Sequence, residues 1–235
     1  MSEGWGQIFF HAITLLLAFD ADLYSIIFVS FSVSLLALVI TLVPSILLGF
    51  SLAFARFKGR WLLTTIIQTL QSIPTVVIGL LVYILLTRQG PFGDLQWLFT
   101  QKAMILGQML ICIPILVSLS QAAFTHIDRR GWETSRTLGR SSTATLLLCC
   151  RELKVPLLLT VVTAFSRIIT EVGCSMMVGG NILNATRNIP TAIALETNKG
   201  EFSQAIALGM VLLLLSLTLN LCLAALRGNA MIRSY

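Results

Sequence analysis

Long apolar runs alternate with short polar segments along this chain of 235 residues. Four of the runs lack Asp, Glu, Lys and Arg, and each exceeds the roughly 20 residues that a helix needs to cross the hydrocarbon core of a bilayer. A fifth run is equally apolar apart from Arg167 and Glu171. None alternates over about ten residues as a transmembrane strand does. The pattern therefore predicts five membrane-spanning helices, at about residues 25–55, 61–87, 103–125, 155–178 and 203–226.

The composition also indicates an integral membrane protein. Hydrophobic residues make up 56% of the chain and charged residues 11%, whereas soluble domains carry about 25% charged residues. The longest polar segment, residues 126–154, is too short for a soluble domain, so we predict one all-α membrane domain over residues 1–235. Residues 5–19 form an apolar stretch that is short for a span. We expect them to form an interfacial helix on the membrane, with a short sixth span as the alternative.

The basic residues favour an orientation with the N-terminus outside and the C-terminus in the cytoplasm. In that orientation, eleven of the sixteen Lys and Arg residues face inward, four face outward, and Arg167 lies within a span. Such an inward excess is the general rule for membrane proteins. The sequence therefore predicts a multi-pass protein of the plasma or inner membrane, in contact with lipid. The net charge of +6 needs no nucleic-acid partner to explain it.

The polar segment 126–154 contains a candidate docking helix. Residues 132–138 can form a short amphipathic helix, with Glu133 near its positive N-terminal end and small residues that allow another surface to approach closely. On this interpretation the segment contacts a soluble cytoplasmic partner. The alternative is a solvated loop helix without a partner. The residues concerned are Trp132, Glu133, Thr134, Ser135, Leu138 and Gly139.

The order Glu133-Thr134-Ser135-x-x-x-Gly139 resembles the E-A-A-x-x-x-G loop of ABC importer permeases. Residues 165–201, which read FSRIITEVGCSMMVGGNI and later TRNIPTAIALETNKGE, resemble the tungstate branch of the molybdate, tungstate and sulfate permeases. The likeness extends over nearly the whole chain. Two departures are the hydroxyl residues in place of both alanines, and Glu152 where many relatives have Leu-Pro. The second departure bears on the shape of the later part of the loop.

This resemblance implies a type I ABC importer permease. In that family a homodimer encloses the translocation pathway, and two copies of a separate ATPase drive it through the coupling loop. An extracytoplasmic binding protein delivers the cargo, expected here to be an oxyanion, with tungstate first. Molybdate, sulfate or an amino acid are the alternatives within the same architecture. A small ATP-independent secondary transporter is the alternative from another class, but the chain shows no convincing inverted repeat.

Arg167 and Glu171 are four residues apart within a span and therefore share one helix face. Ionised residues inside a membrane mark a pathway by default, because they are costly unless paired or wet. A structural clamp, in which the two charges neutralise each other, is the alternative. The resemblance adds that related permeases carry Arg and Glu at matching positions.

A polar segment before the last predicted span supplies further candidates. The resemblance implies that this region helps to form the outer gate and the contact surface for the binding protein. An ordinary exposed loop is the alternative interpretation. The candidate residues are Asn181, Thr186, Arg187 and Thr191.

No catalytic motif is recognisable. The chain lacks the G-x-x-x-x-G-K-[ST] phosphate loop, so it is not expected to be the ATPase itself. It also lacks H-E-x-x-H and G-x-S-x-G, and its five cysteines have no metal-ligand spacing. We therefore expect a transport subunit that is not an enzyme and carries no cofactor.

Changing the docking helix should separate insertion from coupling. We expect Glu133→Arg or Gly139→Trp to leave the chain in the membrane but to weaken its contact with the ATPase, because the first reverses the helix-terminal charge and the second blocks close approach. Co-purification of the ATPase together with transport assays measures the effect. Wild-type values for both would contradict the docking role.

Overall fold

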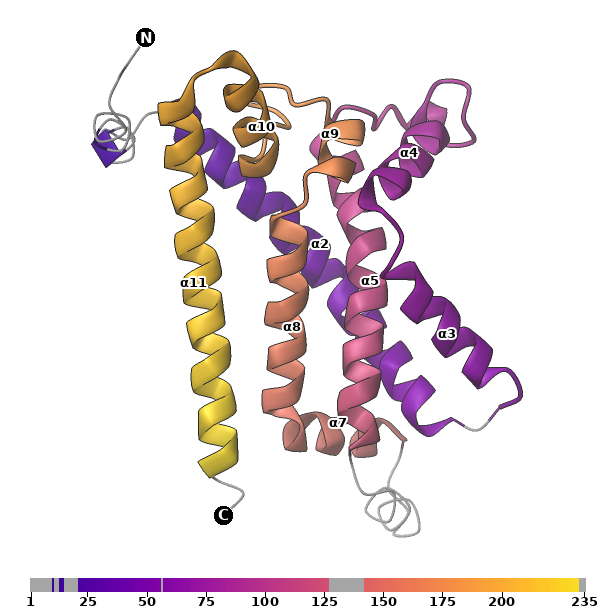
Figure 1. The fold of residues 1–235 in the computed structure, drawn as a ribbon. Coiled ribbons are helices and arrows are strands. Elements are labelled where there is room, and N and C mark those ends of the chain that lie inside the picture. The colour runs from indigo at the N-terminus through magenta and orange to yellow at the C-terminus, as the bar shows by residue number, and fades with distance from the viewer. Residues whose placement is uncertain (1–9, 11–12, 15–20, 56, 127–141, 233–235) are drawn as a thin grey trace.

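The computed structural model describes residues 10, 13–14, 21–55, 57–126 and 142–232, and the regular elements beyond residue 20 are all helices. Four of them, α2, α5, α8 and α11, run between two ends of the molecule (Figure 1). We call these the α10 end, where α2 begins, and the α7 end, where α11 finishes. The helices are α2 Ala21–Phe54, α3 Arg60–Leu70, α4 Thr75–Leu86, η1 Gly93–Leu95, α5 Gln101–Thr125, α7 Ser142–Glu152, α8 Lys154–Ile169, α9 Gly173–Gly179, α10 Ile189–Lys199 and α11 Phe202–Ile232.

The most extensive helix contact joins α2 and α5 through a seam of small side chains on α2. Small residues at membrane helix interfaces allow backbones to approach closely. The resulting van der Waals contact holds the helices together where lipid, itself apolar, provides no hydrophobic effect between them. A Cβ atom on Gly49 would come within 3.0 Å of the backbone of Val117 and Gln121 on α5. The seam is part of a row of small buried residues along α2, and the first of them, Ser30, contacts Ile189 of α10. The row consists of Ser30, Ser34, Ala37, Thr41, Ser45 and Gly49.

Two of the predicted spans are each built from two helices. The angle between α3 and α4 is 96°, and the angle between α8 and α9 is 57°. Pro74 directly precedes α4. A proline at this position costs no helical hydrogen bond, because N–H groups at the start of a helix have no intrahelical acceptor. Three helices are long and apolar enough to cross a membrane on their own, and the total is five if each bent pair counts as one span. The five predicted spans correspond to that second count.

Two predicted segments lie outside the described residues. Most of the expected interfacial helix at residues 5–19 is among them, and so is the stretch 127–141 with the whole proposed docking motif. The described part of the polar segment resumes as α7, which packs against the beginning of α8 at the α7 end (Figure 1).

Helix α9 is held between α4 and α5 by close contacts at two glycines. A Cβ atom on Gly79 of α4 would lie 2.9 Å from the Cα atom of Cys174. A Cβ atom on Gly107 of α5 would collide with the Cys174 sulfur. The short helix α9 therefore depends on the absence of side chains at these two positions.

Replacing Gly79 with valine should loosen this packing. We expect Gly79→Val to destabilise the protein by about 1–3 kcal/mol, the usual range for overpacking, because the backbone of α9 has to move. Thermal unfolding of the purified protein measures the effect. Gly209→Val on α11 is the matched control, since no atom lies within 4 Å of a Cβ built there. Equal unfolding temperatures for the two variants would contradict this account.

Candidate functional site

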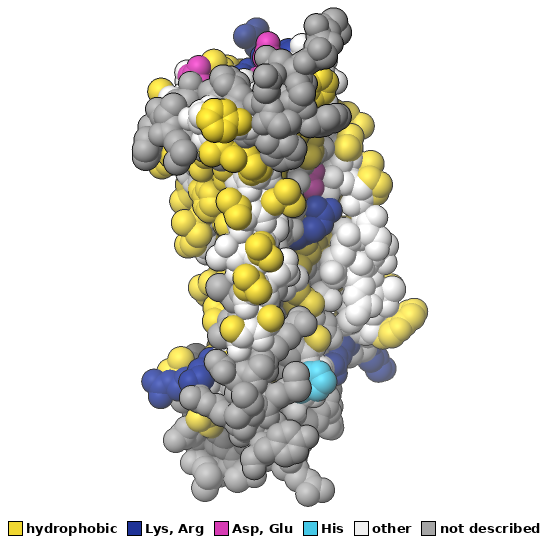
Figure 2. All heavy atoms as spheres, turned by 60° about the vertical axis from the view of Figure 1, so that its left-hand side comes forward, with side chains coloured by type: hydrophobic (Ala, Val, Ile, Leu, Met, Phe, Trp, Pro, Cys, Tyr) yellow, Lys and Arg dark blue, Asp and Glu magenta, His cyan; other side chains and the backbone are white. Residues whose placement is uncertain are grey.

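The Arg167 guanidinium pairs with the Glu171 carboxylate across one turn at the end of α8. The distance from Arg167 Nη1 to Glu171 Oε2 is 3.2 Å. The Glu171 side chain is 3% exposed, whereas that of Arg167 is 50% exposed. A basic and an acidic patch adjoin one another part-way along the face in Figure 2, where apolar side chains otherwise predominate. The pair is thus asymmetric, with a buried anion and a half-exposed cation.

Glu171 also stabilises the bend between α8 and α9. Its second oxygen, Oε1, accepts a hydrogen bond from the backbone N–H of Cys174 at 3.1 Å. The first N–H groups of a helix have no intrahelical partner, and a carboxylate at that position satisfies one of them and suits the helix dipole. The geometry therefore supports a structural role for Glu171. A structural role of this kind does not explain why half of the Arg167 side chain is exposed.

Two of the four residues expected at the outer gate are buried within the loop between α9 and α10. Thr186 donates a hydrogen bond to the Gly179 carbonyl at 2.6 Å and accepts one from the Ile182 N–H at 3.0 Å. Thr191 exchanges hydrogen bonds with Asn188 in a capping box that begins α10. Both threonines are almost fully buried, so their side chains shape this loop from within.

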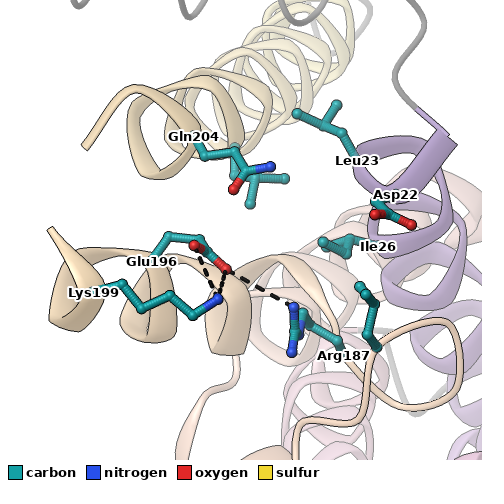
Figure 3. A pocket seen from close by; sticks show the side chains of 9 residues that line it. Asp22, Leu23, Ile26, Arg187, Glu196, Lys199 and Gln204 are labelled. Carbon is teal, nitrogen blue, oxygen red and sulfur yellow. Dashed lines mark hydrogen bonds and ion pairs between the residues drawn. The ribbon is translucent and has the colours of Figure 1, made fainter. Parts of the chain in front are cut away.

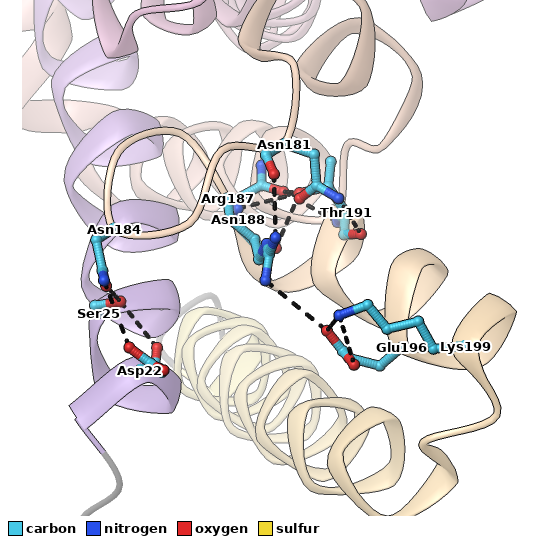
Figure 4. A network of polar contacts seen from close by, with 9 residues as sticks. All are labelled: Asp22, Ser25, Asn181, Asn184, Arg187, Asn188, Thr191, Glu196 and Lys199. Carbon is cyan, nitrogen blue, oxygen red and sulfur yellow. Dashed lines mark hydrogen bonds and ion pairs between the residues drawn. The ribbon is translucent and has the colours of Figure 1, made fainter.

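The other two candidates, Asn181 and Arg187, contact each other in the same network (Figure 4). The Asn181 amide donates to the Thr191 carbonyl, and Arg187 Nη2 donates to the Asn181 carbonyl at 3.4 Å. The structure thus brings all four predicted residues together. The loop is joined to α2 by the Ile189 N–H, which donates to the Ser30 hydroxyl at 2.6 Å.

Two charged residues that the sequence analysis did not single out, Glu196 and Lys199, form a cluster with Arg187 beside this loop. Glu196 accepts hydrogen bonds from Lys199, the shorter at 3.0 Å, and lies 3.9 Å from Arg187. These three residues line a cavity of about 180 Å³ together with Asp22 and Gln204 (Figure 3). Glu196 and Lys199 are three residues apart on α10, a spacing from which their ion pair could have been predicted.

Helix α3 has a polar side and an apolar side, and none of its residues is buried. Leu62, Ile66 and Leu70 lie on one side. The other side carries uncharged hydrogen-bonding side chains, and Thr64 alone among them accepts a bond from α5, from the Gln121 amide at 3.4 Å. The exposed residues of the polar side are Gln68 on α3 and Gln71 and Ser72 in the turn that follows the helix.

The described cysteines lack features of a reactive site. Cys112, Cys149, Cys150 and Cys174 are free thiols. Burial raises the pKa of the Cys149 thiol, and the nearby charges of Glu152 and Cys150 raise it further. Because the thiolate is the reactive form, this thiol is a poor nucleophile.

Similar proteins are transport permeases. The tungstate uptake system permease protein TupB of Peptoclostridium acidaminophilum is 42% identical, with 89% of this chain and 92% of that protein covered. The tungstate uptake system permease protein TupB of Campylobacter jejuni is 41% identical, with 71% and 70% covered. The structure of the MetNI methionine ABC transporter in inward-facing conformations has a TM-score of 0.63 at 14% identity, over 96% of this chain and 99% of that chain, which shows a shared fold.

The family model for "binding-protein-dependent transport system inner membrane component" matches residues 45–229. The membership expected from the coupling motif and from residues 165–201 is confirmed by this match. The likeness to the MetNI structure confirms the predicted all-α, type I permease fold. Because the matched region is well over half of the chain, this protein belongs to the inner membrane components of binding-protein-dependent transport systems, the permease subunits of ABC importers.

Proposed function

We propose that this chain is the transmembrane subunit of an ATP-driven oxyanion importer, with tungstate as its cargo. The observation that carries the proposal is the 42% identity to a tungstate uptake permease over 92% of that protein's length. Two copies of the chain form the pathway, and two copies of a separate ATPase drive it. An extracytoplasmic binding protein delivers the ion.

The chemistry of a dianion explains the need for such a device. Moving a charge of −2 inward against a potential of about 100 mV costs roughly 4.6 kcal/mol. Removing the hydration shell of the ion costs far more. Import therefore needs a hydrated, alternately gated pathway and an external energy source.

In this proposal the α10 end faces outward. The excess of basic residues in the segments of the opposite end supports this orientation. The cluster of Arg187, Glu196 and Lys199 then lies on the side where a binding protein docks, and the loop carrying Asn181 contributes to the outer gate. Thr186 and Thr191 support that loop from inside.

Arg167 and the polar side of α3 are proposed to line the pathway. The Arg167 side chain is half exposed, and a charged side chain facing lipid would be costly, so this residue requires water or a partner subunit. The uncharged side chains of α3 can donate hydrogen bonds to an anion without binding it as tightly as a cation would. The coupling loop 126–154 links this pathway to the ATPase.

The cargo can be tested by transport. Deletion of the gene should abolish high-affinity tungstate uptake in cells that lack a redundant system, and re-expression of the wild-type chain should restore it. Uptake of tungstate, molybdate and sulfate is compared in the same strains. Unchanged tungstate uptake would contradict the proposal, and a selective loss of molybdate or sulfate uptake would assign the cargo to that ion. ATP-independent uptake by vesicles that contain this chain alone would indicate a secondary transporter.

A further inference from the structure

We propose that Arg167 is a transient contact for the oxyanion in the pathway, and that Glu171 is a fixed counter-ion that keeps this contact weak. This inference rests on the proposed function, because it concerns how the same pathway holds and releases its cargo. It assigns different tasks to the two residues of one ion pair. Arg167 meets the anion, and Glu171 limits how tightly the anion is held.

The Arg167 guanidinium has donors to spare. It carries five N–H groups, and Glu171 is its one partner among the residues that the structure describes. Half of the side chain is exposed. The planar fork of an arginine matches the oxygens of an oxyanion through two parallel hydrogen bonds. Arg167 can therefore turn from Glu171 toward an anion, while Glu171 keeps its own position.

Glu171, by contrast, is held in one position. Its side chain is buried. Oε2 accepts a hydrogen bond from the Arg167 guanidinium, and Oε1 accepts one from the Cys174 N–H at 3.1 Å. That second bond ties the carboxylate to the first turn of α9, where Cys174 packs against Gly79 with its backbone and against Gly107 with its side chain. Glu171 cannot follow Arg167 toward the cargo. It remains as the anchor to which the guanidinium returns.

The charge balance of a homodimer makes this arrangement useful. Two arginines without counter-ions would match a dianion in charge and would bind it too tightly to release it. Two arginines paired with two glutamates are neutral overall, so an arriving oxyanion competes with a resident carboxylate for each guanidinium. The cargo can displace the carboxylate for a short time, and the carboxylate in turn displaces the cargo.

The substitution that isolates the charge of Glu171 is Glu171→Gln. Glutamine keeps an oxygen that can accept the Cys174 N–H but removes the negative charge facing Arg167. We expect the purified complex with its ATPase, without nucleotide or binding protein, to bind tungstate with a dissociation constant lower than that of wild type by about ten-fold or more. Equilibrium dialysis with elemental analysis of tungsten measures this constant. Maximal uptake with the binding protein present should fall, because release becomes slow.

Two further variants separate this role from a structural one. Combining Arg167→Gln with Glu171→Gln should abolish the gain in tungstate affinity, since the cation that binds the ion is gone. Glu201→Gln is the matched control, because Glu201 is an exposed carboxylate at the start of α11 and its neutralisation should leave the dissociation constant at the wild-type value. A merely structural role for Glu171 would not make any variant bind more tungstate.

Three outcomes would overturn the inference. They are an unchanged dissociation constant in Glu171→Gln, a gain in affinity that persists in the double variant, and failure of Glu171→Gln to assemble with the ATPase although the hydrogen-bond acceptor is kept. The proposed function fails in a different way, namely if the wild-type complex does not transport tungstate. Wild-type transport without a gain in Glu171→Gln would contradict this inference alone.

Discussion

The structure depends on one constraint, which is that broken helices inside a bilayer must satisfy their backbone ends without water. The interruption between α8 and α9 meets this constraint through the Glu171 carboxylate, which accepts the Cys174 N–H at the start of α9. That carboxylate in turn needs a cation, which Arg167 supplies. The local requirement of one helix end thus places an ion pair at the bend of the predicted fourth span. The transport chemistry proposed for Arg167 uses a group that the fold already requires.

Hydropathy alone located α2, α5 and α11, because each contains a long run without charge and needs no further information. It could not predict the two bends, since a window average records how apolar a stretch is and not the direction of its helix. The 96° bend between α3 and α4 lies close to Pro74, and α4 beyond it packs against α9. No proline lies at the second bend. It depends on Glu171 and on the space at Gly173, where a Cβ atom would lie 2.6 Å from Val76.

The loop before α10 shows why polarity is an incomplete guide to a site. Thr186 and Thr191 attracted attention because they are polar residues in a segment expected to be exposed. The structure uses both to satisfy the backbone of a tight loop, and they are buried for that reason. Asn188 caps the start of α10, and Ser30 ties α10 to α2 by accepting a hydrogen bond from the Ile189 N–H. Neither role was predicted from the sequence. A hydroxyl that bonds to a distant backbone and one that faces solvent look the same in a sequence.

The small-residue seam between α2 and α5 also determines which parts of the molecule can move. Because the backbones approach closely at Gly49, we expect α2 and α5 to move together rather than slide past one another. Helix α3 is different, because it buries none of its residues and joins α4 through the short turn at 71–74. That turn can serve as a pivot, with α3 as a lever that swings against a stationary frame. In the orientation proposed above, an ATPase that acts at the α7 end would move α3 before it displaced α2 and α5.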